Sequence, residues 1–105
     1  MSTQSPKPEK KRITLHLVFP DRQPETVLCD SVRLTVKDSG KGKGGGLYGI
    51  RPGHAPALFL LEKGITEAFS EGKSVMKLAT AEGFARVAEN TVTVVTGAAG
   101  PETYE

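Results

Sequence analysis

The side chains that could do chemistry in this 105-residue sequence are few and scattered. Its only histidines are His16 and His54, and its only cysteine is Cys29. A catalytic zinc ion commonly needs three protein ligands, and neither histidine has a second imidazole or a thiolate close to it in the sequence. We therefore expect no metal site. A single cysteine also excludes an intramolecular disulfide and a thiolate zinc cage, which favours a cytosolic compartment.

The residue types of a catalytic triad are present, but not in a catalytic context. Cys29, Asp30, Ser31 and His54 supply a nucleophile, a base and a carboxylate. No nucleophile elbow or other local signature surrounds them, and such signatures normally accompany covalent catalysis. We predict that this chain is not an enzyme.

A glycine pattern resembles a dinucleotide-binding motif in its letters only. Gly44, Gly46 and Gly49 fit G-x-G-x-x-G, a pattern that must open a helix before it can bind a pyrophosphate. Pro52 and Pro56 follow instead, and proline neither donates a backbone hydrogen bond nor fits a helix interior. A Walker sequence of Gly-Lys-Ser or Gly-Lys-Thr is absent as well. The sequence thus predicts no cofactor.

The elements that must position these residues are short strands. Residues 13–19 alternate strictly, which is typical of a half-buried strand with Ile13, Leu15, Leu17 and Phe19 on its inner face. Further strands are expected at 26–29, 32–37, 48–50, 57–62, 65–69, 74–80, 82–88 and 91–96. About nine or ten short strands without a helical period predict an all-β fold, an antiparallel β-sandwich or flattened barrel.

Some positions in these strands can be assigned to a face or a turn. In residues 32–37, Arg33, Thr35 and Lys37 should face water. Residues 71–72 and 89–90 read as tight turns, the second as a two-residue hairpin connection. We expect Gly83 to allow a bulge and the ring of Phe84 to fill the core.

Composition divides the chain into one domain and two tails. We predict a disordered tail at 1–11, a β-sandwich domain at 12–97 and a second tail at 98–105. The formal charge of +2 is too small to indicate a nucleic-acid or membrane surface. No stretch approaches the length of a membrane span, so we expect no direct membrane insertion.

The most specific stretch is GGLYGIRPGHAP, residues 45–56. Its two prolines exclude a helix, and Gly49 and Gly53 should supply positive φ or close backbone approach. We expect a short strand that breaks into a tight turn with His54 at its tip. His54 either locks the turn through hydrogen bonds or belongs to an interface. Leu47 and Tyr48 are either ordinary core residues or an apolar contact at the sandwich edge.

This stretch, together with AEGFARVAENTVTVVT further on, resembles the epsilon subunit of rotary ATP synthases over roughly residues 13 to 97. The resemblance implies a non-catalytic part of the central stalk, in which a β-sandwich bridges the gamma subunit and the c-ring. Rotation of the ring would then turn the gamma shaft and drive ATP synthesis. The implied location is peripheral, on the cytoplasmic face of the energy-transducing membrane.

The resemblance also implies interface residues. Residues Lys43, Gly46, Leu47 and Tyr48 would face the c-ring, whereas Phe19 and His54 would lie toward the gamma shaft. Family members often carry a carboxylate where this chain has Gly46-Leu47-Tyr48, so a ring contact here would be apolar. The sequence stops at Glu105 without the family's helical hairpin. If the sequence is complete, we expect neither autoinhibition nor a nucleotide site.

Two other classes of protein are alternatives. A free-standing β-barrel could bind single-stranded nucleic acid through Lys41, Lys43 and the basic N-terminal tail, with affinity that falls steeply with salt. Its aromatic residues are scattered and not interleaved with basic ones, which disfavours this alternative. A small hydrolase would need a convergent polar cluster in a pocket, and the sequence shows no sign of one.

Overall fold

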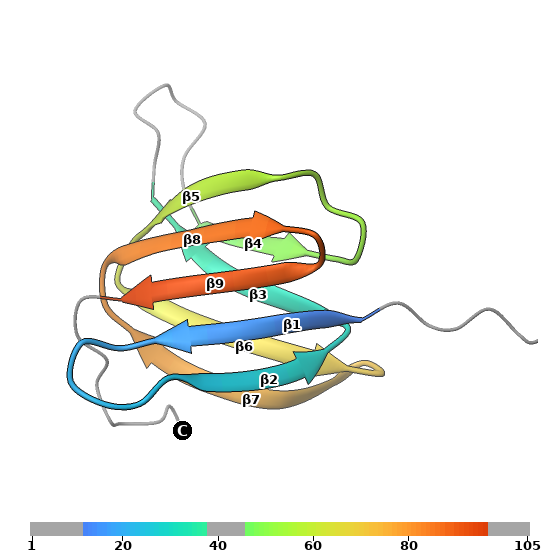
Figure 1. Ribbon diagram of the computed structural model, residues 1–105, viewed down its shortest axis with the longest axis horizontal. Coiled ribbons are helices and arrows are strands. Elements are labelled where there is room, and N and C mark those ends of the chain that lie inside the picture. The colour runs from blue at the N-terminus through green and yellow to red at the C-terminus, as the bar shows by residue number, and fades with distance from the viewer. Residues whose placement is uncertain (1–11, 38–45, 97–105) are drawn as a thin grey trace, which may run out of the picture.

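The computed structural model describes residues 12–37 and 46–96, shown in colour in Figure 1. The two predicted tails and most of the glycine-rich loop, including Lys43, lie outside the described residues. Within the described part every regular element is a strand. The strands are β1 (Ile13–Val18), β2 (Glu25–Cys29), β3 (Ser31–Val36), β4 (Gly46–Ile50), β5 (Ala57–Leu61), β6 (Gly64–Ser70), β7 (Lys73–Thr80), β8 (Gly83–Ala88) and β9 (Thr91–Thr96).

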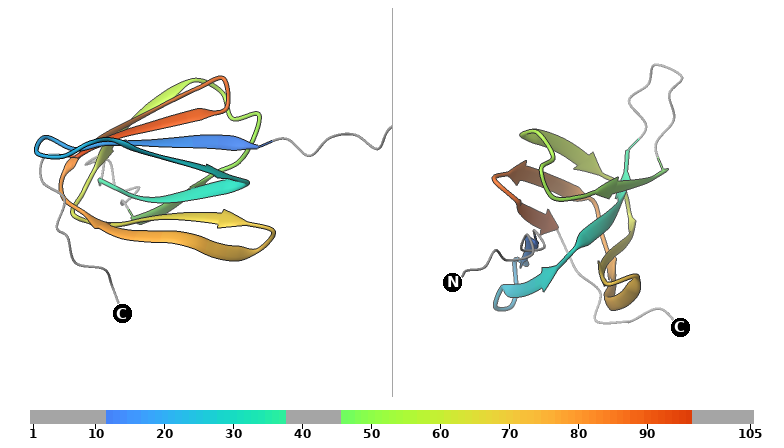
Figure 2. Two further views of the ribbon diagram at one scale, coloured as in Figure 1. Left: turned by 60° about the horizontal axis from the view of Figure 1, so that its bottom comes forward. Right: turned by 90° about the vertical axis from the view of Figure 1, so that its right-hand side faces the viewer.

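The strands form two layers, which the views in Figures 1 and 2 show converging at one side. The front sheet has the order β2-β1-β9-β8-β5, and the back sheet consists of β4, β3, β6 and β7. The layers join where Val36 of β3 pairs with Leu61 of β5. The predicted all-β sandwich is confirmed. One pair departs from the antiparallel pattern, because β1 and β9 run parallel.

The core lies between the two layers and follows the alternation of the sequence. In β1 and β9, every second residue is buried and the intervening ones are partly exposed. The fully buried side chains include Ile13, Leu15, Leu17, Val32, Leu34, Ile50, Val87, Val92 and Val94. Burying an aliphatic side chain of this size stabilises a fold by roughly 1.5–3 kcal/mol relative to leaving it exposed. Hydrophobic burial on the inner faces therefore fixes which side of each strand faces inward.

Both predicted tight turns are present. Glu71 and Gly72 have φ of 54° and 80°, and Glu89 and Asn90 have φ of 52° and 60°. Positive φ at two consecutive residues is typical of the type I′ turn, whose twist matches that of the strands it joins. In the second turn Ala88 pairs directly with Thr91, which confirms the two-residue hairpin.

Two predictions for β8 are wrong. Gly83 continues the regular pairing with Thr96, so it marks no bulge. It is required because an added Cβ would lie 2.0 Å from the backbone oxygen of Val95. Phe84 faces outward with 41% of its surface exposed, because Ala85 takes the inward position. The sheet's irregularity lies elsewhere, at residues 68–69 of β6.

Thr35 does not face water as expected. Its Oγ1 atom accepts a hydrogen bond from the amide of Ile65 at 3.0 Å and lies 3.2 Å from the Ile65 carbonyl oxygen, to which it can donate. A hydroxyl can do both, so this side chain joins β3 to β6 where their backbone pairing has ended. The predictions that Arg33 and Lys37 are exposed are confirmed.

The strand directions define two ends of the sandwich. Odd-numbered strands finish at one end, which we call the Phe19 end, and even-numbered strands finish at the other, which we call the His54 end. Residues 51–56, 71–72 and 89–90 lie at the His54 end, on the right in Figure 1. Val36 and Gly46, which pair where β3 ends and β4 begins, lie at the Phe19 end, as do the residues that follow β1.

Candidate docking surfaces

The predicted shaft-facing residues Phe19 and His54 lie at opposite ends of the sandwich. Phe19 follows Val18, whose partner Val95 is near the end of β9, whereas the His54 turn contacts Asn90, just before β9 begins. Phe19 is 6% exposed and belongs to the core. The guanidinium of Arg22 lies 4.2 Å from the centre of its ring. A partner reaching this position would therefore meet Arg22 as well as the edge of the ring.

His54 is held by a well-defined turn. The amide of His54 donates to the Arg51 carbonyl at 3.2 Å, and Gly53 has φ of 88°. Proline at the second position and a left-handed glycine at the third are the signature of a type II turn. Gly53 thus has the positive φ predicted from the sequence. Gly49 does not, and no atom lies within 4 Å of where its Cβ would be.

The imidazole of His54 uses both nitrogens in the fold. Nδ1 lies 2.7 Å from the carbonyl oxygen of Ala55, an acceptor, so Nδ1 carries the proton. Nε2 then accepts a hydrogen bond from the Tyr48 hydroxyl at 3.0 Å. The ring of Tyr48 also packs on Phe59, with ring centres 4.7 Å apart. The turn is joined to the β8–β9 hairpin as well, because the Gly53 amide donates to Asn90 Oδ1 at 2.7 Å. These bonds lock the turn, which is the first of the two predicted roles.

The predicted ring-facing residues divide between two sides of β4. Leu47 pairs with Thr35 and points outward, with 63% of its surface exposed. Tyr48 pairs with the buried Leu34 and points toward β5, where it meets His54 and Phe59. Neither residue is an ordinary core residue. Gly46 begins the strand with φ of 124°, and Lys43 lies outside the described residues.

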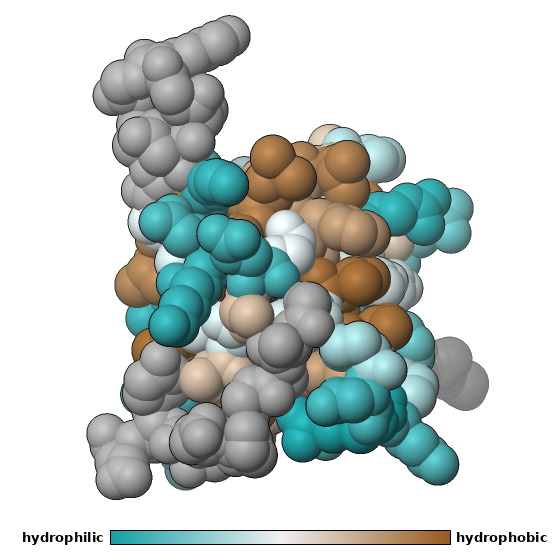
Figure 3. Space-filling model, turned by 90° about the vertical axis from the view of Figure 1, so that its left-hand side faces the viewer, coloured by the Kyte–Doolittle hydropathy of each residue, from teal (hydrophilic) through white to brown (hydrophobic). Residues whose placement is uncertain are grey.

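The outer face of the front sheet carries a row of apolar side chains that the sequence analysis did not identify. Leu60 pairs with Phe84, Phe84 with Val95, and Val95 with Val18, so the row crosses four strands. Leu60 is 61% exposed, and its neighbour Leu58 is exposed to a similar degree. Figure 3 shows apolar surface gathered toward the β5 and β8 side of the molecule. A pocket of about 340 Å³ adjoins the row between Phe84 and Phe19.

Contiguous exposed apolar surface of this kind marks an interaction site more often than isolated apolar residues do. Phe84 and Arg86 alternate with the buried Ala85 and Val87, and this pattern could have revealed the outward direction of Phe84. We call the four residues Val18, Leu60, Phe84 and Val95 the apolar row.

Charged residues cross the centre of the outer face of the back sheet. Arg33 of β3 pairs with Glu67 of β6, and Glu67 pairs with Lys77 of β7. On the other side Arg33 pairs with Gly49 of β4. An open groove of about 690 Å³ lies here, lined by Asp30, Ser31, Val32, Arg33, Gly49, Arg51, Pro52, Phe69, Glu71 and Gly72. The two outer faces therefore differ in chemistry although both are made of paired strands.

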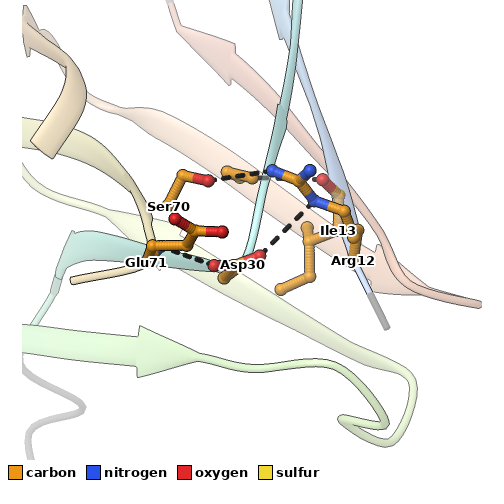
Figure 4. Close-up of polar contacts among 6 residues, drawn as sticks. Arg12, Ile13, Asp30, Ser70 and Glu71 are labelled. Carbon is orange, nitrogen blue, oxygen red and sulfur yellow. Dashed lines mark hydrogen bonds and ion pairs between the residues drawn. The ribbon is translucent and has the colours of Figure 1, made fainter. Parts of the chain in front are cut away.

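A polar cluster at the His54 end ties the first strand to the β6–β7 turn (Figure 4). Arg12 Nε lies 3.4 Å from Asp30 Oδ1, and the same guanidinium donates to Ser70 Oγ at 2.9 Å. Asp30 Oδ2 accepts a hydrogen bond from the Glu71 amide at 2.6 Å. Beside this cluster the Cys29 thiol is buried, and burial is the main cause that raises the pKa of Cys29. These groups are engaged in structural contacts.

The described residues hold no group of three or more His, Cys, Asp or Glu side chains placed to bind a metal ion. They also contain no helix of the length and apolarity needed to cross a membrane.

A β-sandwich whose polar groups serve the fold and whose outer faces are open has the character of a docking module. Residues 12–102 match the family model described as the ATP synthase, Delta/Epsilon chain, beta-sandwich domain. The chain belongs to this family, which confirms the resemblance stated from the sequence.

Relatives from bacteria agree with the family model. The ATP synthase epsilon chain of Desulfitobacterium hafniense is 35% identical over 88 residues, which cover 84% of this chain and 61% of the relative. That of Myxococcus xanthus is 32% identical over 92 residues, covering 88% of this chain and 62% of the relative. This chain therefore spans about three fifths of the length of these curated relatives. The matches give no support to the alternative of a nucleic-acid-binding barrel.

Solved structures show the same fold. A chain in the cryo-EM structure of Euglena gracilis mitochondrial ATP synthase, OSCP/F1/c-ring, superposes with a TM-score of 0.69 at 23% identity, covering 92% of this chain and 62% of that one. A chain in the Tetrahymena thermophila mitochondrial ATP synthase central stalk and c-ring gives 0.61 at 15% identity, covering 89% of this chain and 69% of that one. At these identities the likeness concerns the fold.

Proposed function

We propose that this chain is the β-sandwich part of an ATP synthase epsilon subunit, and that it couples rotation of a c-ring to a gamma shaft without a catalytic site of its own. The family match over residues 12–102 supports the assignment to the complex. The apolar row supports a docking role, because its two largest side chains, Leu60 and Phe84, are exposed to solvent and lie outside the core.

The front face is the surface that we assign to the gamma subunit. A stable protein interface has a well-packed apolar centre and a polar rim. The apolar row supplies such a centre, and Arg86 and His16, on the neighbouring row of the same face, supply part of a rim. Phe19 lies under the adjoining pocket, so its proposed role is to support this surface from the core side.

The Phe19 end is the end that we assign to the c-ring. Gly46 begins β4 at this end, where it pairs with Val36, and Lys43 precedes it in the sequence, outside the described residues. Leu47, exposed on β4, would make an apolar contact there. Tyr48 and His54 keep the predicted interface role as a proposal, and their hydrogen bond would hold the far turn rigid while the shaft rotates. This arrangement would put the chain at the cytoplasmic face of the membrane, as a peripheral member of the complex.

The test is binding to the gamma subunit and c-ring of the ATP synthase from the organism that carries this sequence. The double variant Leu60→Glu and Phe84→Glu places two carboxylates in the apolar row, on side chains already exposed, so the fold should persist. We expect the affinity for gamma to fall by about 1,000-fold, since two buried interface anchors that contribute roughly 2 kcal/mol or more each are lost. Val75→Glu is the matched control, because Val75 is 51% exposed on the edge strand β7 of the other sheet.

Loss of gamma binding in the double variant, with retention in the control, would support the proposal. Equal binding of all three proteins would show that the front face does not dock the shaft. Failure of the unaltered chain to join gamma, combined with tight and steeply salt-dependent binding to single-stranded RNA, would favour the nucleic-acid-binding alternative instead.

A further inference from the structure

We propose that the groove on the back sheet binds an extended, acidic segment of a partner protein, with two alternating carboxylates seated against Arg33 and Arg51. This inference does not depend on the proposed function, because the groove lies on the face opposite the apolar row.

The groove forms where two small residues, Ser31 and Gly49, lie beside two long ones, Arg33 and Arg51. Arg33 pairs with Gly49, and Arg51 stands two residues beyond Gly49 on the same chain. Ser31 stands two residues before Arg33 and pairs with Phe69. Gly49 has no side chain, and the space where its Cβ would be contains no atom within 4 Å. The floor is thus low, and Arg33 and Arg51 are both among the residues that line the groove.

Neither arginine has an ionic partner in the described part of the chain. Glu67 lies opposite Arg33 on β6, yet no carboxylate comes within ion-pair distance of either guanidinium among the described residues. Arg33 lies instead over the ring of Phe69, 4.9 Å from its centre. A guanidinium stacked on an aromatic face keeps its planar array of N–H donors available for a carboxylate. Both positions are exposed, so a ligand can reach them.

Charge within the groove favours a carboxylate at the arginines. Asp30 also lines the groove, but its charge is offset by Arg12. Glu71 remains at the rim beside Gly72, on the β6–β7 turn. A ligand carrying several phosphates would meet this carboxylate and be repelled. A protein segment carries spaced carboxylates together with backbone N–H groups, and Glu71 can accept hydrogen bonds from these N–H groups. The groove therefore fits a protein segment better than a ligand with several phosphates.

The spacing of the arginines matches an extended chain. Diagonal neighbours on adjacent antiparallel strands are separated by roughly 7–8 Å. In an extended segment, side chains at alternate positions point to the same side and are separated by about 6.6–6.8 Å. Two carboxylates at alternate positions would therefore both point toward the face that carries the two arginines, whereas two at adjacent positions would point to opposite sides of the segment.

The experiment titrates short capped peptides into the isotope-labelled chain and follows the backbone amides of Ser31, Gly49 and Gly72 by NMR. The probe is acetyl-Val-Asp-Val-Glu-Val-amide. One control, acetyl-Val-Asp-Glu-Val-Val-amide, has the same composition with adjacent carboxylates. The other control, acetyl-Val-Asn-Val-Gln-Val-amide, is the neutral counterpart of the probe. We expect the alternating peptide to bind at least about fivefold more tightly than either control.

Three variants test the groove itself. Arg33→Gln and Arg51→Gln should each weaken binding of the alternating peptide by at least about fivefold. Gly49→Val fills the floor without changing any charge, and should abolish binding while leaving the fold intact because nothing occupies that space. Lys77→Gln removes a charge from the same face outside the groove and should leave binding unchanged.

Several results would overturn the proposal. These are equal binding of the neutral peptide, no preference for alternating carboxylates, undiminished binding to Gly49→Val, or no shift at any of the three amides. Tripolyphosphate serves as the competing probe. If it shifted the same amides at lower concentration than the peptide, the groove would be a general anion site and the assignment to a protein segment would fail.

Discussion

The two outer faces of this sandwich share one backbone architecture and differ almost completely in what they present. On the front face, strand pairing places Leu60, Phe84 and Val95 side by side on three successive strands. On the back face, the same kind of pairing brings Arg33 opposite Glu67, beside the hollow over Gly49. The buried faces hold the core that determines this fold, and we propose that the outer faces serve two different kinds of partner.

The largest expected difference between the two sheets is in how much a glycine-to-alanine substitution changes the free energy of unfolding. Gly83→Ala would force a Cβ against the backbone of β9, and we expect a loss of about 3 kcal/mol in the free energy of unfolding. Gly49→Ala meets no neighbour and should be neutral or stabilising by up to about 1 kcal/mol, because the unfolded chain has less conformational entropy with alanine than with glycine, so less is lost on folding. Urea unfolding of both variants provides the measurement. Similar losses in the two would show that the space over Gly49 is not open.

The next largest expected difference is in how binding at the two faces depends on salt concentration. Raising sodium chloride from about 0.05 M to about 0.5 M shortens the screening length roughly threefold. We expect binding of the alternating acidic peptide to the groove to weaken by about tenfold. Binding of gamma to the apolar row should change by less than about twofold, because it rests on apolar contact. Equal salt dependence at both faces would contradict the distinction drawn between them.

The sequence predicted the interior far better than the outer faces. Alternation from Ile13 to Phe19 specified the first strand, because burial on one side must repeat every second residue. The Glu89-Asn90 hairpin followed from turn chemistry alone. Phe84 was assigned to the core on its size, although the alternation of β8 places it outside. The size of an aromatic side chain does not predict which face of a strand it lies on. The alternation of the neighbouring residues does.

The candidate sites depend on partners that are distant in the sequence. The groove could not be predicted, because it requires the register between β3 and β4, which are separated by a long glycine-rich connection. Gly49 was read as a site of close approach, yet it lies open. Likewise Phe19 and His54 were expected to share one partner surface, and only the parallel pairing of β1 with β9 shows that they lie at opposite ends.

The two type I′ hairpins allow a smaller test, since one belongs to each sheet. Asn90→Gly keeps a residue suited to positive φ but removes the Oδ1 atom that accepts from Gly53. We expect a loss of about 1 kcal/mol in the free energy of unfolding. The matched change in the other hairpin is Gly72→Asn, which should cost less than about 0.5 kcal/mol. Thermal unfolding measures both. A stabilised Asn90→Gly variant would mean that the link to the His54 turn contributes nothing.

The smallest expected effect concerns Cys29, in the interior between the two sheets. It is a dependence of the free energy of unfolding on pH. Burial raises the pKa of Cys29, so the folded state holds the thiol proton more tightly than the unfolded state does. This contribution to stability is therefore fully present below about pH 8.5, the ordinary thiol range, and declines as the pH rises through the folded pKa. Urea unfolding from neutral to alkaline pH should show a steeper decline for the unaltered chain than for Cys29→Ala. Parallel declines would contradict the assignment.

The parallel pairing of β1 with β9 also constrains how the molecule is made. Within this domain the first strand, β1, lies beside the last, β9, and the front sheet has no continuous centre until β9 has been synthesised. Contacts this distant in sequence form slowly, because the intervening chain must be brought together first. During synthesis the apolar side chains of β1 therefore remain without their final neighbours, and chaperones have their main opportunity to act in that interval.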